Sequence, residues 1–274
     1  MLPCRVRNGK LPAVKAAFAL QRGDGRGDDQ ARPLSFTLDF VKYAEGSVLA
    51  RAGDTLVVCN VTVEGRVPPF LRDTGEGWLT GEYAMLPRAT EERMQRDVTR
   101  GSISGRSAEI QRLIGRSLRA ALDLGLLGER TLIVDCDVLQ ADGGTRTTAI
   151  SGAFVAVALA LLRLRAQGAL PAWPVKDQVA AVSVGLLGQR ALLDLGYEED
   201  SRVDVDFNVV ATKRGGLVEV QGTAERGSFA RRQLDALLDL AERGLEKVFA
   251  TQNAALAARL VDGGVRDLVT TSIP

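Results

Sequence analysis

The most constraining feature of this sequence is the stretch DVLQADGGTRTTAISGAFVAVALALLRL, residues 137–164. An apolar run that reads as a strand ends in an acid, two glycines and an arginine, and a helix of mostly Ala, Val and Leu follows at once. Because this helix is apolar around most of its circumference, it must be buried on most sides by other layers of structure. The polar loop before it suits the binding of an anion better than it suits packing.

Strand and helix patterns appear in two rounds along the chain and can supply such layers. The first round contains a β-branched hairpin at 34–67 with the turn RAGD at 51–54, a proline- and glycine-rich irregular excursion at 68–97, a helix at 107–122 capped by Ser104 or Ser107, and a strand at 130–140. The second contains two hairpins, with turns near Gly188 and at KRGG (213–216), and a long helix at 230–260. The sequence therefore predicts an α+β fold of two intimately packed halves, with no Pro- or Ser-rich linker between them.

The composition excludes several kinds of chemistry. The 274 residues include no histidine, which removes a Ser-His-Asp triad, a Cys-His pair and an imidazole metal site. Cys4, Cys59 and Cys136 form no CxxC pair and are expected to be thiols in a cytoplasmic protein. No apolar run reaches the ~20 residues that span a bilayer, so we expect no membrane partner. Residues 1–20 are too weakly apolar for a secretory signal and are predicted to be a disordered extension.

Two loops that contain glycine and arginine each open a helix. In ADGGTRTTAISG, Gly143 and Gly144 allow an anion to approach the backbone, and the amides from Thr145 onward lie at a helix N-terminus. Arg146 adds a planar fork of donors, and Arg106 has the same place in GSISGRSAEIQR. A tight strand-to-helix turn or a solvated helix face with ion pairs explains each loop equally well, so an anion site requires that the two loops converge.

Acidic residues crowd one segment of the second half, LLDLGYEEDSRVDVDFNVV, at Asp194, Glu198, Glu199, Asp200, Asp204 and Asp206. Glu198 and Glu199 are expected to be solvated, whereas Asp204 and Asp206 are expected to share one face of a strand. Asp200 and Asp206 bracket the entry to an apolar strand, where a carboxylate needs a metal, an arginine or a reacting group. Without His or Cys ligands, the metal would be Mg²⁺ or Mn²⁺. Arginines that hold phosphate, together with these carboxylates, indicate phosphoryl chemistry.

Several longer motifs carry a resemblance to a known family. They are KYAEGSVLARAGDTLVVC, VPPFLRDTGEGWLTGEYAMLPRAT, SGRSAEIQRLIGRSLRAALDL, DCDVLQADGGTRTTAISGA and EVQGTAE. From about Arg22 to about Ala258, the chain closely resembles the bacterial ribonuclease PH family of phosphate-dependent 3′ to 5′ exoribonucleases. The resemblance implies the ribonuclease PH fold, in which two halves of the ribosomal-protein-S5-domain-2-like type share one core. These halves would span about 21–165 and 175–258, and residues 259–274 would form a C-terminal tail.

The resemblance also implies a reaction and the residues that perform it. Members trim the 3′ ends of tRNA precursors and other RNA, release nucleoside diphosphates, and add nucleotides in reverse as tRNA nucleotidyltransferases. Inorganic phosphate is the co-substrate. The family positions for phosphate binding correspond here to Arg106, Gly144, Thr145 and Arg146, those for the metal and proton transfer to Asp200 and Asp206, and those for RNA to Arg88, Arg93 and Arg96. We assign Asp200 as the acid and Asp206 as the main metal ligand. Members assemble as a homohexameric ring, a trimer of dimers.

Three departures and two alternatives accompany this resemblance. Tyr43 and Glu91 stand where the family usually has His, and Gly196 stands where it has an acid. Since Glu91 and Glu92 place negative charge in the RNA-contacting loop, RNA binding is expected to be weaker than is usual in the family. An inert ring subunit is the first alternative, but it would have no chemical reason to keep Arg106, Arg146 and both aspartates. A polynucleotide phosphorylase is the second, and this chain is too short for its two cores.

Overall fold

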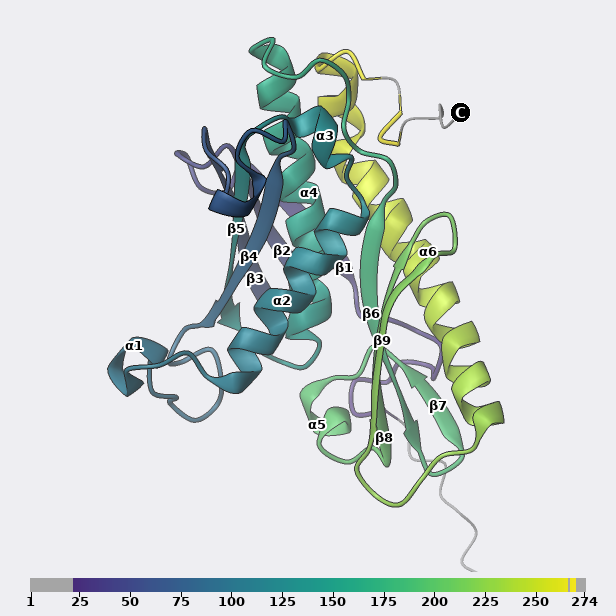
Figure 1. Ribbon diagram of the computed structural model, residues 1–274. Coiled ribbons are helices and arrows are strands. Elements are labelled where there is room, and N and C mark those ends of the chain that lie inside the picture. Colours follow the sequence, from purple (N-terminus) through teal and green to yellow (C-terminus); the bar gives the residue numbers. More distant parts are fainter. Residues whose placement is uncertain (1–21, 266, 270–274) are drawn as a thin grey trace, which may run out of the picture.

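The protein has four layers, sheet, helices, sheet and helix, in a computed structural model that describes residues 22–265 and 267–269 (Figure 1). The extension predicted at 1–20, with Cys4, lies outside the described residues. Helices α2 (Gly105–Ala120) and α4 (Thr145–Ala166) lie between a five-stranded and a four-stranded sheet, and α6 (Arg231–Asp262) covers the other face of the second sheet. The α+β fold class is therefore confirmed.

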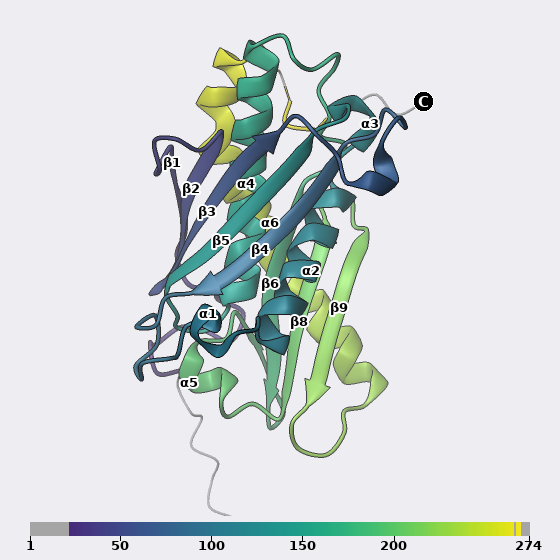
Figure 2. The same ribbon diagram turned by 60° about the vertical axis from the view of Figure 1, so that its left-hand side comes forward.

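The first sheet comes from the first half of the chain. Its strands are β1 (Leu34–Leu38), β2 (Gly46–Ala52), β3 (Thr55–Glu64), β4 (Trp78–Met85) and β5 (Thr131–Gln140), in the order β1-β2-β3-β5-β4. The predicted hairpin turn joins β2 to β3 through Gly53, whose φ of 57° suits glycine. All neighbours are antiparallel except β4 and β5, which run parallel (Figure 2). A parallel pair needs a crossover, which here contains α2.

Two helices of the first half, α2 and α4, pack against the first sheet. The helices of this half are η1 (Pro69–Leu71), α1 (Asp97–Arg100), α2 (Gly105–Ala120), α3 (Leu124–Leu127) and α4 (Thr145–Ala166). The side chain of Ser104 caps α2 by accepting a hydrogen bond from the backbone N–H of Ser107 at 3.0 Å, as one of the two predicted caps. Ile110, Leu113 and Ile114 form the buried face of α2. Because α2 is held in this way, its first turn, which carries Arg106, has a fixed position relative to the first sheet.

The second half repeats the arrangement of strands followed by a helix. Its strands are β6 (Val179–Leu187), β7 (Arg190–Leu193), β8 (Val205–Thr212) and β9 (Leu217–Ala224), in the order β7-β6-β8-β9, and its helices are α5 (Tyr197–Asp200) and α6 (Arg231–Asp262). Both predicted hairpins are present, β6-β7 and β8-β9, and all pairs are antiparallel. The helix α6 runs across the boundary expected at 258 and ends at Asp262.

The apolar helix α4 is the centre of the core. It packs against β2 and β3 on one side and β6 on the other, and it belongs to one cluster of buried residues that also includes Val179 and Ala181 of β6. The sheet approaches closely at Gly46, where an added Cβ would lie 2.0 Å from the carbonyl oxygen of Ala156. Within the described part of the chain, α4 alone is long and apolar enough to cross a membrane, and 94% of that window is buried inside the protein. Its apolar character is accounted for by this packing.

The expectation for the segment 68–97 is wrong in part, and the expectation for the two described cysteines is confirmed. The excursion at 68–97 is not irregular throughout, because Trp78–Met85 forms β4 with Leu79, Gly81 and Tyr83 buried. The alternation is short and contains glycine, and neighbouring prolines and glycines conceal it. Cys59 and Cys136 are free buried thiols, as expected, and face each other across β3 and β5 with their Sγ atoms 3.9 Å apart.

Candidate active site

The glycine loop between β5 and α4 is shaped by close contact with the second half. Gly143 and Gly144 have φ angles of 73° and 63°, which side-chain-bearing residues rarely adopt. A Cβ on Gly143 would lie 2.5 Å from the carbonyl oxygen of Leu195, so no other residue fits without displacing the segment before α5. Gly144 precedes α4 and offers no side-chain cap, which leaves the first amides of the helix to a ligand.

Thr145, the first residue of α4, is held by a tyrosine that sequence reasoning missed. The Tyr83 hydroxyl in β4 donates a hydrogen bond to Thr145 Oγ1 at 2.8 Å, and both side chains are buried. Burial raises the pKa of Tyr83, while Thr145 and the charges of Arg106 and Arg146 oppose the increase. The tyrosine therefore fixes the start of α4 as a neutral donor near both arginines.

The two arginine loops converge at this point. Arg106 lies in the exposed first turn of α2, and Glu109 on the same helix is 3.7 Å from the Nη1 atom of Arg146. Arg146 Nη1 also donates a hydrogen bond to Gln221 Oε1 in β9. Both arginines are close enough to lower the pKa values of Asp200 and Asp206. The two arginine loops therefore lie close together, as an anion site would require.

Asp200 and Asp206 face the same site from α5 and β8. Burial raises the pKa of Asp206 to about 6, the charge of Asp200 adds to the increase, and Arg146 opposes it. The pKa of Asp200 is also raised by burial, against Arg106 and Arg146. Glu225, which follows β9 and was missed from the sequence, raises both pKa values. The arrangement holds two carboxylates that take up protons more readily than free aspartate does.

The carboxylates fit a hard divalent metal. Asp206 Oδ1 is buried and has no hydrogen-bond partner among the described residues. A buried carboxylate oxygen without a partner is costly unless a cation or proton meets it. No group of three or more His, Cys, Asp or Glu residues suited to a metal occurs in the described chain, so Asp200 and Asp206 would supply the protein ligands and water or phosphate the rest. Mg²⁺ commonly binds through one or two carboxylates in this way.

The other predicted acids lie outside this site. The expectation that Glu199 is solvated is wrong, because Arg22 donates to both of its carboxylate oxygens at 2.6 Å. Arg22 is 177 residues away in sequence, so no local pattern could show this pairing. Glu198 is exposed, as expected. Asp204 precedes β8 rather than sharing a strand face with Asp206, and it accepts a hydrogen bond from the backbone N–H of Gly188.

The loop that carries Arg88, Arg93 and Arg96 emerges beside the glycine loop. All three side chains are exposed. The carbonyl oxygen of Ala89 accepts a hydrogen bond from the N–H of Ala141 at 2.8 Å, which ties this arginine loop to the end of β5. Exposed arginines beside the glycine loop suit the phosphates of a polynucleotide.

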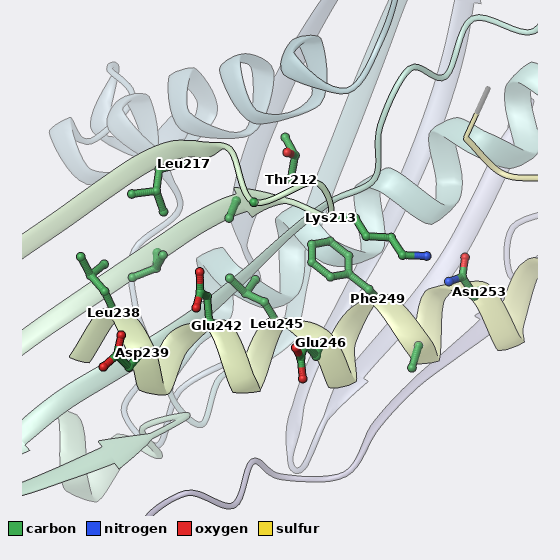
Figure 3. A pocket seen from close by; sticks show the side chains of 14 residues that line it. Thr212, Lys213, Leu217, Leu238, Asp239, Glu242, Leu245, Glu246, Phe249 and Asn253 are labelled. Atoms are coloured by element: carbon green, nitrogen blue, oxygen red, sulfur yellow. The ribbon is translucent and has the colours of Figure 1, made fainter. Parts of the chain in front are cut away.

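A separate hollow between α6 and the β8-β9 hairpin contains none of the predicted site residues (Figure 3). Its floor is apolar, with Leu238, Leu245 and Phe249, and Asp239 and Glu242 lie at its rim. No arginine is among its lining residues, and its glycine, Gly215, lies in a hairpin turn and not at the start of a helix. The charged cluster around Arg146 is therefore the better candidate for phosphoryl chemistry.

Comparison with known proteins identifies the family. Family models described as "3' exoribonuclease family, domain 1" and "domain 2" match residues 30–163 and 177–244. The chain belongs to the 3′ exoribonuclease family. Within this family it is 58% identical over 235 residues to a protein named Ribonuclease PH from Moorella thermoacetica, covering 86% of this chain and 94% of that one. It is 54% identical over 240 residues to Ribonuclease PH of Bacillus subtilis, covering 87% and 98%.

A solved structure shares the architecture of this chain. The structure, described as an Archaeoglobus fulgidus exosome with RNA bound to the active site, matches with a TM-score of 0.69 and 25% identity, covering 84% of this chain and 93% of that one. The two-half fold expected from the resemblance is therefore confirmed.

Proposed function

We propose that this protein is a phosphate-dependent 3′ to 5′ exoribonuclease that trims the 3′ ends of tRNA precursors. An oxygen of inorganic phosphate attacks the terminal phosphodiester, the bond from phosphorus to the 3′ oxygen breaks, and that oxygen takes up a proton. The products are a nucleoside diphosphate and an RNA shorter by one nucleotide. The observation that carries the proposal is that Arg106 and Arg146 lie close enough to Asp200 and Asp206 to lower their pKa values, with Glu109 of α2 3.7 Å from Arg146.

Each residue has a role in this proposal that follows from its place. The amides at the start of α4, with Thr145, Arg106 and Arg146, bind the attacking phosphate and neutralise charge that develops in the transition state. Asp200, which is exposed and holds its proton more firmly than free aspartate, protonates the leaving oxygen. Asp206 binds Mg²⁺ or Mn²⁺, which supplies further charge neutralisation when bound. The reaction needs no covalent nucleophile.

In this proposal, the arginine loop binds the RNA. The loop contacts phosphates of the tRNA stem through the exposed side chains of Arg88, Arg93 and Arg96. Assembly is proposed as a homohexameric ring of dimers, supported by the likeness to a subunit of an exosome. Because Cys59 and Cys136 are unpaired thiols, we place the protein in the cytoplasm.

The test is incubation of the purified protein with a 3′-extended transfer RNA and Mg²⁺, with and without inorganic phosphate, followed by mass analysis of the products. Nucleoside diphosphates should appear only with phosphate and should vanish in Arg146→Ala. Nucleoside monophosphates in the absence of phosphate would mean hydrolysis and would contradict the proposal. RNA that stays bound but uncleaved would identify an inert subunit instead.

A further inference from the structure

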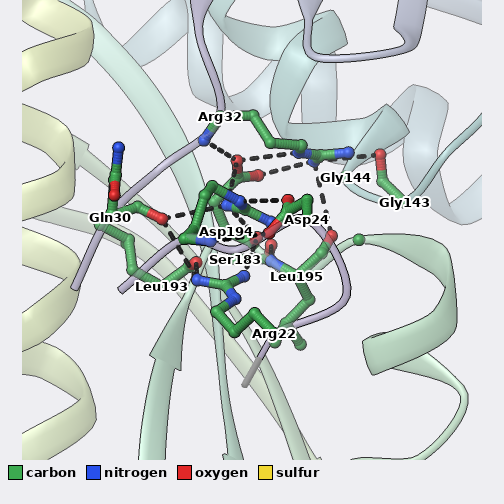
Figure 4. A network of polar contacts seen from close by, with 12 residues as sticks. Arg22, Asp24, Gln30, Arg32, Gly143, Gly144, Ser183, Leu193, Asp194 and Leu195 are labelled. Atoms are coloured by element: carbon green, nitrogen blue, oxygen red, sulfur yellow. Dashed lines mark hydrogen bonds and ion pairs between the residues drawn. The ribbon is translucent and has the colours of Figure 1, made fainter. Parts of the chain in front are cut away.

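Three arginines of the segment before β1 are almost fully buried against the segment that leads into α5 (Figure 4). The side chains of Arg22, Arg26 and Arg32 are 1%, 7% and 5% exposed. A guanidinium does not lose its charge in proteins, so its burial is costly unless fixed acceptors surround it. Each of these arginines therefore holds its acceptors in one arrangement.

Arg32 joins the glycine loop to the segment before α5. Its Nε and Nη2 atoms donate to the two carboxylate oxygens of Asp194 at 2.9 and 2.7 Å, and its backbone N–H donates to the same carboxylate at 2.7 Å. On the other side, Nη1 donates to the carbonyl oxygen of Asp142 and Nη2 to that of Gly143 at 3.4 Å. One planar group thus spans two loops that come from different halves of the chain (Figure 4).

Arg22 holds only the α5 side of this junction. It donates to both oxygens of Glu199 and to the carbonyl oxygens of Leu193 and Asp194, each of the last two at 2.8 Å. Glu199 Oε2 in turn accepts a hydrogen bond from the N–H of Gly196 at 2.9 Å, which caps α5. The next residue after Glu199 is Asp200, the last residue of α5.

The two loops also contact each other directly. Gly143 packs against the backbone of residues 195–197, and Asp142 Oδ1 accepts a hydrogen bond from the N–H of Tyr197 at 3.4 Å. The two loops therefore meet at this junction, and the separation between the start of α4 and Asp200 depends on it.

We propose that Arg32 and Arg22 are positioning residues for phosphorolysis, and this rests on the function proposed above. Through Asp194 and Glu199, they set the distance between the phosphate-binding end of α4 and Asp200, although neither is a catalytic residue. Arg32 holds both the glycine loop and the segment that leads to Asp200. Of these two, Arg22 holds only the segment that leads to Asp200. The two arginines should consequently affect different kinetic constants.

The test is steady-state phosphorolysis of a 3′-extended transfer RNA by the full chain, with phosphate as the varied substrate. A lysine keeps the charge but lacks the fork that both arginines use. Arg32→Lys should raise the KM for phosphate about tenfold and lower kcat about tenfold, because both loops shift. Arg22→Lys should lower kcat about tenfold and leave the KM for phosphate within about twofold, because the glycine loop keeps its own contacts.

Arg190→Lys is the matched control. Arg190 also donates to both oxygens of a carboxylate, Asp28 in the same N-terminal segment, but these two side chains are more exposed, at 32% and 41%, and Asp28 belongs to neither the glycine loop nor the segment before α5. Both of its kinetic constants should stay within about twofold of the unchanged protein.

The outcomes separate this inference from the function on which it rests. An unchanged protein that releases no nucleoside diphosphate refutes the function, whatever the variants do. If it is active and Arg32→Lys behaves like Arg190→Lys, the positioning role is wrong. Arg32→Lys and Arg22→Lys could also lose kcat equally, keep the same KM for phosphate, and lose folded protein to a matching extent in thermal unfolding. That result would mean that both arginines have a merely structural role, and it would also overturn the positioning role. Should Arg22→Lys not fold, Glu199→Gln replaces it, with the same expected loss of kcat.

Discussion

At the scale of single residues, a proton and a metal compete for Asp206. Without metal its pKa is raised to about 6, so the carboxyl is mostly protonated below that pH and ionised above it. Metals bind the ionised form, and each bound proton must leave first. Below pH 6 the Mg²⁺ concentration for half-maximal phosphorolysis should therefore rise about tenfold per pH unit, and above pH 6 it should stay level. Mg²⁺ titrations from about pH 5 to about pH 8 measure this dependence.

The same shift predicts the sign of a stability change in the metal-free protein. Because the folded pKa of Asp206 lies above the ordinary aspartate value of 3.8, the folded state binds this proton more tightly than the unfolded state. Its contribution to stability is therefore present below the unfolded pKa and is lost as the pH rises through about 6. In Asp206→Asn this part of the pH dependence should disappear from urea unfolding curves. A half-saturating Mg²⁺ concentration that is constant across the titration would contradict the competition.

Removal of the negative charge of Glu91 should raise the affinity of the protein for RNA. Its side chain and that of Glu92 are exposed in the loop that carries Arg88 and Arg93. A negative charge there repels the phosphates of RNA, so Glu91→His should tighten binding of a transfer RNA about threefold at low salt. Filter binding at several salt concentrations measures it. Glu91→Gln removes the charge alone and should give most of the gain, whereas an unchanged affinity in Glu91→His would refute the expectation.

At the scale of elements, a substitution in the glycine loop would measure how tightly the two halves pack against each other. Gly143→Ala combines a positive φ with a Cβ 2.5 Å from the Leu195 carbonyl oxygen, and should destabilise the protein by about 3 kcal/mol. It should also lower phosphorolysis more than the loss of stability explains. Gly188→Ala has a φ of 63° but open space around its Cβ, so it should cost only about 1 kcal/mol and keep activity. Thermal unfolding and phosphorolysis rates of both variants measure the difference, and equal effects would refute the fit.

Most elements of this fold could be predicted because their signals are local. The hairpin turn at Gly53 and the cap at Ser104 follow from residues within a few positions of each other. The strand β4 could not, because its alternation is brief and glycine occupies one of its buried positions. The distinction is physical: turn and cap chemistry is short-range, whereas a short strand is stabilised by the neighbour that it pairs with, here β5.

At the scale of the whole molecule, the site belongs to neither half alone. Arg106 and Arg146 come from the first half, and Asp200 and Asp206 from the second. The sequence indicated their residue types, but the convergence depends on the packing of α4 between the two sheets. Tyr83, Gln221 and Glu225 could not be found by composition, because their roles exist only through contacts made by that packing.

The oligomeric state is the prediction that concerns the complete assembly. A ring of six chains of 29.3 kDa should have a mass of about 176 kDa in light scattering coupled to size-exclusion chromatography. The isolated chain leaves large apolar side chains at the surface, including Phe70 at 66% and Leu217 at 57% exposure, and burial in contacts between subunits would remove such area from water. Dilution that dissociates the ring should reduce phosphorolysis of transfer RNA together with the mass, because a single chain offers only one arginine loop to the RNA. A monomer that keeps full activity at every concentration would refute the ring.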